Sequence, residues 1–229
     1  MKKLKALVTF FKRVFSYFDE QKIAVYTSPV NQKIEVCWVN GVKVLNVGNA
    51  NYSFGSLNKT FRKTFRAIPL KVHEFSRILI LGNAAGGTAS ILRNEYGFEG
   101  RIHGVELDEK ITMIARAHFP QGYQATDKVF HQDGLKFVGE APSGGYDLII
   151  FDIYHDLDVP EHLQTDNFAG EMHRILQNKG MIIYNKVVRS SKTKQEAEAL
   201  EKTLGSVFAD FRKLSFGNFT ENRMFVCRK

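Results

Sequence analysis

Residues 77–109 read RILILGNAAGGTASILRNEYGFEGRIHGVELDE, and this stretch decides the fold. An apolar run, Ile78–Leu81, leads into a glycine-rich turn at residues 82–87, and a helical segment follows. A second apolar run then ends in the acid Glu106. This order of strand, glycine turn, helix, strand and acid is typical of a nucleoside-binding half-site.

The chemistry of the stretch fits that interpretation. Glycines allow a ligand to approach the backbone, and the N-terminus of the following helix is electropositive. The carboxylate of Glu106 can accept hydrogen bonds from both ribose hydroxyls. The turn itself reads G-x-A-x-x-G, with alanine at the central glycine of the dinucleotide pattern. A tight strand-to-helix turn of any α/β domain therefore stays open as an alternative for the turn alone.

Length and composition indicate a folded protein of ordinary type. The chain has 229 residues, 44% of them hydrophobic and 24% charged. That length suits one α/β domain with a small appendage. The two cysteines, Cys37 and Cys227, lie in strand-like runs and predict buried free thiols. We expect a cytoplasmic protein, because disulfide frameworks are absent from the sequence and no apolar run approaches the ~20 residues of a membrane span.

The net charge of +8 is concentrated at one end of the chain. The first 22 residues hold six Lys or Arg and two acids and so contribute +4. Nucleic-acid binding is not expected, since the sequence shows no nucleic-acid-binding module. A basic surface that attracts an acidic partner or substrate is the alternative.

Residues 2–18, KKLKALVTFFKRVFSYF, repeat apolar side chains every three or four positions, which predicts an amphipathic helix. Lys12 and Arg13 interrupt the apolar core and no small-residue cleavage site follows, so we do not expect a signal peptide. Two interpretations stay open. The helix packs on the domain or on a second subunit of an expected homodimer, or it lies on a membrane surface with a basic face.

Three regions follow from these patterns: a helix over residues 1–22, a small β-hairpin domain over 23–70, and an α/β domain over 71–229. The hairpin is indicated by Asn40-Gly41 between two runs rich in valine. From Arg77 onward, strands and helices alternate, which predicts a mostly parallel, Rossmann-like sheet with helices on both faces. The expected strands are 77–81, 101–105, 128–131, 146–151, 180–185 and 222–228, and the expected helices are 87–96, 109–118, 135–138, 165–176 and 193–208.

Polar groups follow four of the expected strands. They are the Gly82 turn, Glu106, Asp133-Gly134 and Asp152. Ligands of open α/β sheets bind beyond the carboxyl ends of the strands. Asp133 can accept a hydrogen bond from an adenine amino group, and Gly134 leaves room for the ring. Asp152 ends a central strand and is expected beside the reactive end of the ligand.

These motifs resemble one known family. The runs RILILGNAAGG, GVELDE, HQDGLKFV, YDLIIFDIYHDLDVPEHLQTDNF and GMIIYN are similar to the S-adenosyl-nucleoside-binding domain of the spermidine synthases, within the class I methyltransferase fold. The resemblance covers residues 25–229 and includes a small β domain before the nucleoside domain. It implies S-adenosylmethionine or its decarboxylated form as cofactor, held by Gly82, Asn83, Gly86, Glu106, Leu107, Asp133, Gly134 and Asp152.

The acceptor end departs from the family pattern. Asn83 and Ala84 replace two glycines of the turn. Aminopropyltransferases have an acid three positions after the residue matching Asp152, and this chain has His155 there, followed by Asp156. Of two further family motifs, only Gln32 and Tyr52 survive as expected acceptor contacts, together with Tyr154.

We therefore expect Asp152, His155 and Asp156 to carry the catalysis, since an imidazole is a suitable general base near neutral pH. Residues 152–162 hold four acids and two histidines, but their spacing matches no known metal motif, so we expect a polar active-site loop and no metal. The expected function is a transferase acting on a small-molecule acceptor, with methyl transfer ahead of ordinary spermidine synthesis. Genuine aminopropyl transfer and a nucleoside-binding protein without activity are the alternatives.

Overall fold

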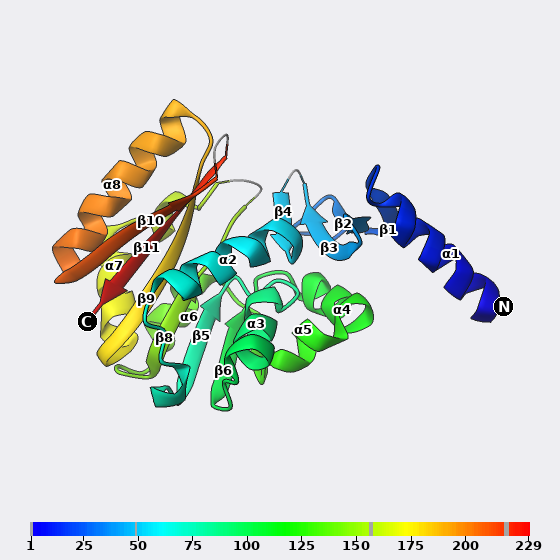
Figure 1. The fold of residues 1–229 in the computed structure, drawn as a ribbon. Helices are drawn as coiled ribbons and strands as arrows, with labels where there is room; N and C mark the ends of the chain where they lie inside the picture. Colours follow the sequence, from blue (N-terminus) through cyan, green and yellow to red (C-terminus); the bar gives the residue numbers. More distant parts are fainter. Residues whose placement is uncertain (1, 49, 156–157, 218–219) are drawn as a thin grey trace.

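A mostly parallel β-sheet forms the centre of the molecule (Figure 1). The computed structural model describes residues 2–48, 50–155, 158–217 and 220–229, with the side chains of residues 2–6 and 50–52 left out. Within these residues the sheet has seven strands in the order β10-β11-β9-β8-β5-β6-β7. Their bounds are β5 Arg77–Leu81, β6 Arg101–Val105, β7 Lys128–Phe130, β8 Tyr146–Phe151, β9 Leu176–Val188, β10 Asp210–Phe216 and β11 Glu221–Arg228.

The direction of the strands follows from the connections. β5, β6, β7, β8 and β9 run parallel to one another, whereas β11 is antiparallel to both β9 and β10. The central strands read RILIL and YDLIIF, and most of their side chains are fully buried. Such continuous apolar runs are characteristic of parallel strands covered on both faces. The predicted α/β architecture is confirmed.

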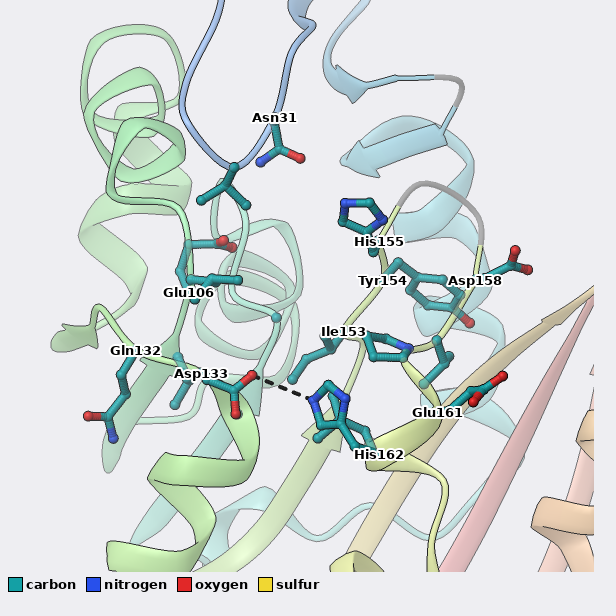
Figure 2. A pocket seen from close by; sticks show the side chains of 18 of the residues that line it. Asn31, Glu106, Gln132, Asp133, Ile153, Tyr154, His155, Asp158, Glu161 and His162 are labelled. Carbon is teal, nitrogen blue, oxygen red and sulfur yellow. Dashed lines mark ion pairs between the residues drawn. The ribbon is translucent and has the colours of Figure 1, made fainter.

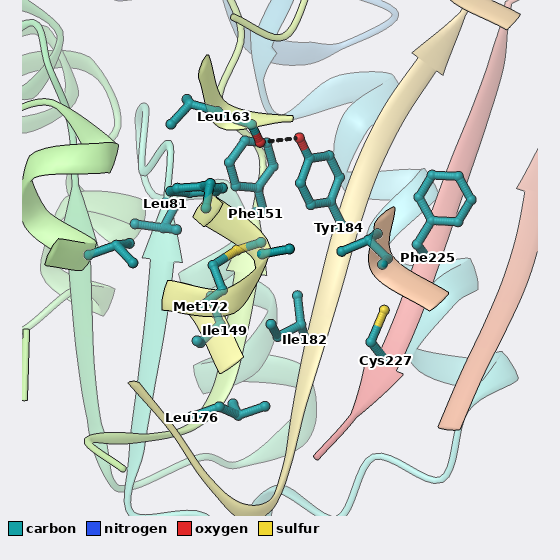
Figure 3. Close-up of a cluster of buried hydrophobic side chains, with 14 of the residues drawn as sticks. Leu81, Ile149, Phe151, Leu163, Met172, Leu176, Ile182, Tyr184, Phe225 and Cys227 are labelled. Carbon is teal, nitrogen blue, oxygen red and sulfur yellow. Dashed lines mark hydrogen bonds between the residues drawn. The ribbon is translucent and has the colours of Figure 1, made fainter. Parts of the chain in front are cut away.

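Helices cover both faces of this sheet (Figure 1). Figure 3 shows the core under α7 and α8, where the rings of Phe151 and Tyr184 stack with centroids 3.9 Å apart. On the other face, α2 buries Phe61 and Phe65 against the large sheet. The helices are α2 Gly55–Ala67, α3 Gly87–Tyr96, α4 Glu109–His118, α5 Pro120–Ala125, α6 Gly134–Glu140, α7 Asp166–Ile175 and α8 Ser191–Val207, with 3-10 turns η1 Val72–Glu74 and η2 Glu161–Leu163.

The smaller sheet precedes the large one in the chain and is antiparallel throughout. Its strands, as far as the chain is described, are β1 Gln21–Tyr26, β2 Ile34–Val39, β3 Val42–Val47 and β4 Ala50–Ser53. Asn40 and Gly41 both have positive φ and form the predicted two-residue turn between β2 and β3. Side chains of β2 and β3 pack on Ile111 and Ile114 of α4, so the small sheet lies against the helix that follows β6.

The N-terminal helix α1, Lys2–Phe15, projects from the body of the molecule and contacts the small sheet near its C-terminal end (Figure 1). The predicted amphipathic helix forms, but its described apolar side chains are exposed. Packing of its apolar face on the protein's own domain, one of the expectations for this helix, is therefore not what the structure shows. Among the described residues, no helix is long and apolar enough to cross a membrane.

Two strands differ from the sequence prediction. β9 begins at Leu176, directly after α7, because the polar residues 177–179 extend the strand through a bend where Lys179 has a φ of 64°. β10 was not predicted, because the lysine and arginine of FRKLSF interrupt its apolar pattern. An edge strand tolerates these charged residues, since part of its side chains are exposed. Cys37 and Cys227 are free and buried, as predicted.

Candidate functional site

A cavity of about 490 Å³ opens at the carboxyl ends of β5, β6, β7 and β8 (Figure 2). It lies where the strand order reverses, because β6 follows β5 on one side and β8 pairs with β5 on the other. Such a switch point is where open α/β sheets bind their ligands. The described lining comprises Val30, Asn31, Gly82, Val105, Glu106, Leu107, Gln132, Asp133, Gly134, Ile153, Tyr154, His155, Asp158, Val159, Pro160, Glu161, His162, Leu163, Lys192 and Glu196.

The glycine turn after β5 forms the floor of the cavity. Gly82 has a φ of 86°, and a side chain there would overlap the backbone carbonyl of Asp152. Gly86 has a φ of 75°, precedes α3 and lies against the backbone of Gly122. Both positions therefore require glycine for close packing of the chain. Of the two, Gly82 lines the cavity, and Gly86 shapes the turn behind it.

The two departures in this turn have structural explanations. The Asn83 side chain is buried and accepts a hydrogen bond from Thr126 Oγ1 at 3.1 Å, so it is not part of the described lining. Ala84 adopts a φ of 44°, a region that favours glycine, and its N–H donates to Glu106 Oε2 at 2.9 Å. The carboxylate of Glu106 thus holds the turn in a conformation that alanine rarely adopts.

Glu106 is the buried acid of the nucleoside half. It follows β6, lines the cavity and is 5% exposed. Its carboxylate accepts from the backbone N–H groups of Ala84 and Asp108, at 2.9 and 3.1 Å. Burial raises its pKa to about 7 in spite of these hydrogen bonds. A ligand that donates hydroxyl groups to this carboxylate would favour its ionised form.

Asp108 ties the small sheet to this half of the site and was not among the predicted residues. It caps α4 through Lys110 N–H at 2.9 Å and accepts from Asn31 Nδ2 at 2.7 Å and from Ser28. These bonds fix the loop between β1 and β2 over the cavity. Asn31 consequently lines the cavity, whereas the neighbouring Gln32 is exposed and is not in the described lining. The sequence did contain a signal for Asp108, because the acid-rich run ELDE precedes a helix and an acid commonly caps a helix N-terminus.

Asp133 has two roles at the end of β7. Its Oδ1 caps α6 by accepting from Leu135 and Lys136 N–H at 2.8 and 3.2 Å, and its Oδ2 lies 3.7 Å from His162 Nε2 (Figure 2). Gly134 lines the cavity beside Ile153, and a side chain there would crowd the Ile153 methyl group. Leu107 completes this half with an exposed apolar side chain.

Asp152 marks the start of the second half of the site. It directly follows β8, and its Oδ1 accepts from Asn185 Nδ2 at 2.8 Å. Burial raises its pKa to about 8. Asn185, at the carboxyl end of β9, is 1% exposed, and its Oδ1 has no hydrogen-bond partner among the described atoms. In the sequence, Asn185 ends the apolar run GMIIYN, as the predicted site residues end theirs. We predicted no role for it.

Tyr154 and His155 continue this wall of the cavity. The Tyr154 hydroxyl donates to Asn185 O at 2.9 Å and accepts from Val187 N–H at 2.8 Å, and burial raises its pKa well above the usual value. His155 is exposed at the mouth, where its backbone pairs with Asp158 (Figure 2). Asp156, the remaining predicted catalytic residue, lies outside the described residues, as does the side chain of Tyr52.

Charged side chains of α8 line the far wall, and a buried lysine of β9 pairs with one of them from behind. The buried Lys186 donates to Glu196 Oε2 at 2.8 Å and to Gln164 Oε1 at 3.0 Å, and Lys192 lies 3.6 Å from the same glutamate. Asp158 pairs with Arg189 at 3.2 Å. These residues were not predicted, because nothing in the helix pattern of residues 193–208 distinguishes Glu196 from a solvated side chain.

Three of the four predicted strand ends line the cavity, and the fourth, Asp152, directly precedes the lining residue Ile153 but is not in the described lining itself. Glu106 and Asp133 stand on the β6–β7 side, and Tyr154 and His155 stand on the β8–β9 side, with Gly82 between them. The first side offers hydrogen-bond acceptors for a nucleoside. The second offers a carboxyl group whose pKa is close to neutral and further carboxylates around it.

Comparison with known proteins identifies the family. The model of the spermine/spermidine synthase domain matches residues 60–217. The polyamine aminopropyltransferase of Nitrosococcus oceani is 34% identical over 178 residues, which cover 74% of this chain and 61% of that protein. The chain thus spans less than two thirds of this relative's length.

Solved structures show the same fold. The spermidine synthase of Thermotoga maritima superposes with a TM-score of 0.66 at 17% identity, covering 91% of this chain and 73% of the other. Human methyltransferase-like protein 13 in complex with SAH gives a TM-score of 0.60 at 22% identity, covering 76% and 82% of the two chains. The chain belongs to the spermine/spermidine synthase family, with a class I methyltransferase-like fold. This membership does not support our first expectation, methyl transfer, and favours the alternative of aminopropyl transfer.

Proposed function

We propose that this chain transfers an aminopropyl group from decarboxylated S-adenosylmethionine to an amine acceptor. One observation carries the proposal. In a member of the spermine/spermidine synthase family, a single cavity joins the buried acid Glu106 to a second end that is lined by carboxyl groups. A cationic donor and a cationic acceptor both require such carboxylates at close range.

The residues of the first half fit the nucleoside part of the donor. Glu106 would accept from the ribose hydroxyls, because its carboxylate faces the cavity from a buried position. Asp133 would accept from the adenine amino group, with the ring between Leu107 and Ile153. Gly82 would let the backbone approach the sulfur-bearing tail, because it lines the cavity and has no side chain.

Asp152 is the proposed proton acceptor of the reaction. The unprotonated nitrogen of the acceptor attacks the aminopropyl carbon next to the sulfonium. The carbon–sulfur bond breaks and its electron pair stays on sulfur, which gives neutral methylthioadenosine. A new carbon–nitrogen bond forms, and the proton lost by the acceptor nitrogen passes to the Asp152 carboxylate. A pKa of about 8 suits this task, because a general base is most effective near the working pH.

The acceptor end indicates a small diamine. Asp158 and Glu161 lie on the wall next to Tyr154, where they would attract the distal ammonium group. Lys192 lines the same cavity and pairs with Glu196, and Arg189 pairs with Asp158, so these cations neutralise the two carboxylates in part. A longer polyamine would place a further ammonium near these cations, which like-charge repulsion disfavours.

The proposal is tested by following both possible transfers in one protein preparation. We expect methylthioadenosine to form from decarboxylated S-adenosylmethionine in the presence of putrescine, together with spermidine as the product. A parallel reaction with S-adenosylmethionine and the same amine should yield no S-adenosylhomocysteine. The Asp152→Asn variant provides the matched control for background chemistry. Formation of S-adenosylhomocysteine without methylthioadenosine would refute aminopropyl transfer, and tight binding of both nucleosides without turnover would indicate a binding protein.

A further inference from the structure

Helix α1 projects from the body of the molecule (Figure 1), and its described apolar side chains are exposed, uncovered by any other described residue. The exposed fractions of its apolar side chains range from 43% at Val14 to 60% at Phe10, and Phe18, just after the helix, is 87% exposed. The described members of this face within the helix are Leu7, Val8, Phe10, Phe11, Val14 and Phe15. Soluble proteins rarely expose a contiguous apolar surface of this kind unless another surface binds it.

The polar side of the same helix is fixed to the body of the protein. Lys12 Nζ donates to Lys22 O, and Arg13 Nε donates to Gly41 O at 3.1 Å. Ser16, directly after the helix, is 3% exposed and accepts from Gly41 N–H at 2.9 Å. Because these residues face the small sheet, the apolar side chains on the opposite side of α1 point away from the protein.

The width of this apolar face fits a planar surface. At about 100° per residue, the six side chains from Leu7 to Phe15 spread over nearly half of the helix circumference. A seam between two helices would bury a narrower stripe, with apolar residues at only two positions in seven. A membrane interface can cover all six at once, because a helix lying in its plane buries the entire apolar side.

The positive charge of residues 2–18 indicates that the surface that binds α1 is negatively charged. Residues 2–18 contain five Lys or Arg and no Asp or Glu, and the whole chain carries a net charge of +8. Two copies of the chain would bring like charges together, whereas anionic lipid headgroups attract each basic residue near the surface by about 1 kcal/mol. We propose that α1 binds the surface of an anionic lipid membrane, with Phe10, Phe11 and Phe15 entering the boundary between headgroups and acyl chains.

Vesicle flotation with the full chain tests this proposal. We expect binding to vesicles that contain phosphatidylglycerol and much weaker binding to vesicles of phosphatidylcholine alone. The double variant Phe11→Asp, Phe15→Asp should lose at least about tenfold in partition coefficient between vesicles and water, because two apolar rings are replaced by charges that the anionic headgroups repel. Met113→Asp is the matched control: this side chain is 59% exposed on α4, and its replacement should leave binding unchanged.

A measurement of mass in solution separates the membrane from a second copy of the chain. The proposal predicts that wild type and the double variant have the same mass and the same unfolding temperature, because the substituted side chains are exposed. Two outcomes would overturn it. One is a wild-type protein that ignores phosphatidylglycerol vesicles. The other is a wild-type dimer that the double variant converts to a monomer, without any binding of vesicles by either protein.

Discussion

The two halves of the cavity are built differently, although both lie at the ends of parallel strands. In the half next to β6 and β7, backbone N–H groups fix the carboxylates of Glu106 and Asp133. In the half next to β8 and β9, another side chain, the amide of Asn185, holds the carboxyl group of Asp152. Backbone contacts depend on the fold, whereas side-chain contacts change with single substitutions. The first half should therefore be common to nucleoside-binding relatives, and the second should set the acceptor.

Substitution of Asp152 should give the largest difference between the two halves, a loss of rate without a loss of nucleoside affinity. Asp152→Asn keeps the size of the side chain and an acceptor for Asn185 Nδ2 but removes the proposed base. We expect the rate of aminopropyl transfer to fall by about 10²- to 10⁴-fold, the usual contribution of a general base. Nucleoside affinity in a calorimetric titration with methylthioadenosine should change little. Asp166→Asn, on the exposed first turn of α7, is the charge-matched control. If Asp152→Asn lowered nucleoside affinity by as large a factor as it lowered the rate, the two halves would not act separately.

Glu106→Ala tests the other half. The substitution removes a bidentate, charge-assisted contact to the ribose hydroxyls, and the whole contact is worth about 1.5–3 kcal/mol. We expect nucleoside affinity to fall by about 10- to 150-fold in the same titration. Glu106 also holds Ala84 N–H, so the unfolding temperature without ligand must be recorded to separate binding from stability. If affinity stays within error of the wild-type value, Glu106 only supports the turn, and the nucleoside binds elsewhere.

The pH dependence of stability should show both halves together. The folded pKa values of Glu106 and Asp152, about 7 and about 8, lie above those of unfolded carboxyl groups, near 4. The folded state therefore binds these protons more tightly. Their contribution to stability is complete below the unfolded pKa and is lost as pH rises through the folded values. Between pH 5 and 8, the free energy of unfolding should fall by at most about 1.4 kcal/mol per pH unit for each group.

Urea unfolding at several pH values measures this slope. The double variant Glu106→Gln, Asp152→Asn carries neither group, so its stability should depend less on pH than that of the wild type. The difference between the two proteins isolates the two carboxyl groups, because every other ionisable group is present in both. A wild-type protein whose stability rises from pH 5 to 8 relative to the variant would contradict the direction of both pKa shifts.

The same division explains what the sequence could predict. The glycine turn, Glu106, Asp133 and Asp152 were predicted because each follows an apolar run, and parallel strands bring such ends together. The pairing of Asp152 with Asn185 could not be predicted. These residues lie 33 positions apart, and the register of β8 with β9 brings them together. Likewise, Asn31 rather than Gln32 lines the cavity because the Asp108 carboxylate orients the loop, and that contact joins residues 77 positions apart. The exposure of α1 was also unpredictable, since an amphipathic pattern defines a face but not what covers it.

His155 offers the smallest and sharpest test of the acceptor half. It occupies the position where aminopropyltransferases are expected to carry an acid, and it is exposed at the mouth of the cavity. In His155→Asp, a carboxylate would attract the cationic acceptor with about 0.3–1 kcal/mol, the contribution of an exposed ion pair. We expect KM for putrescine to fall by about two- to fivefold while kcat stays nearly constant. His73→Asp makes the same substitution at a site 77% exposed on η1 and should change neither constant.

A large drop in kcat of His155→Asp would instead make His155 the base, and loss of turnover in Asp156→Asn would assign that role to the next residue. In either case the acceptor half would depend on this loop and not on Asp152, and the proposed division of labour within the cavity would have to be redrawn.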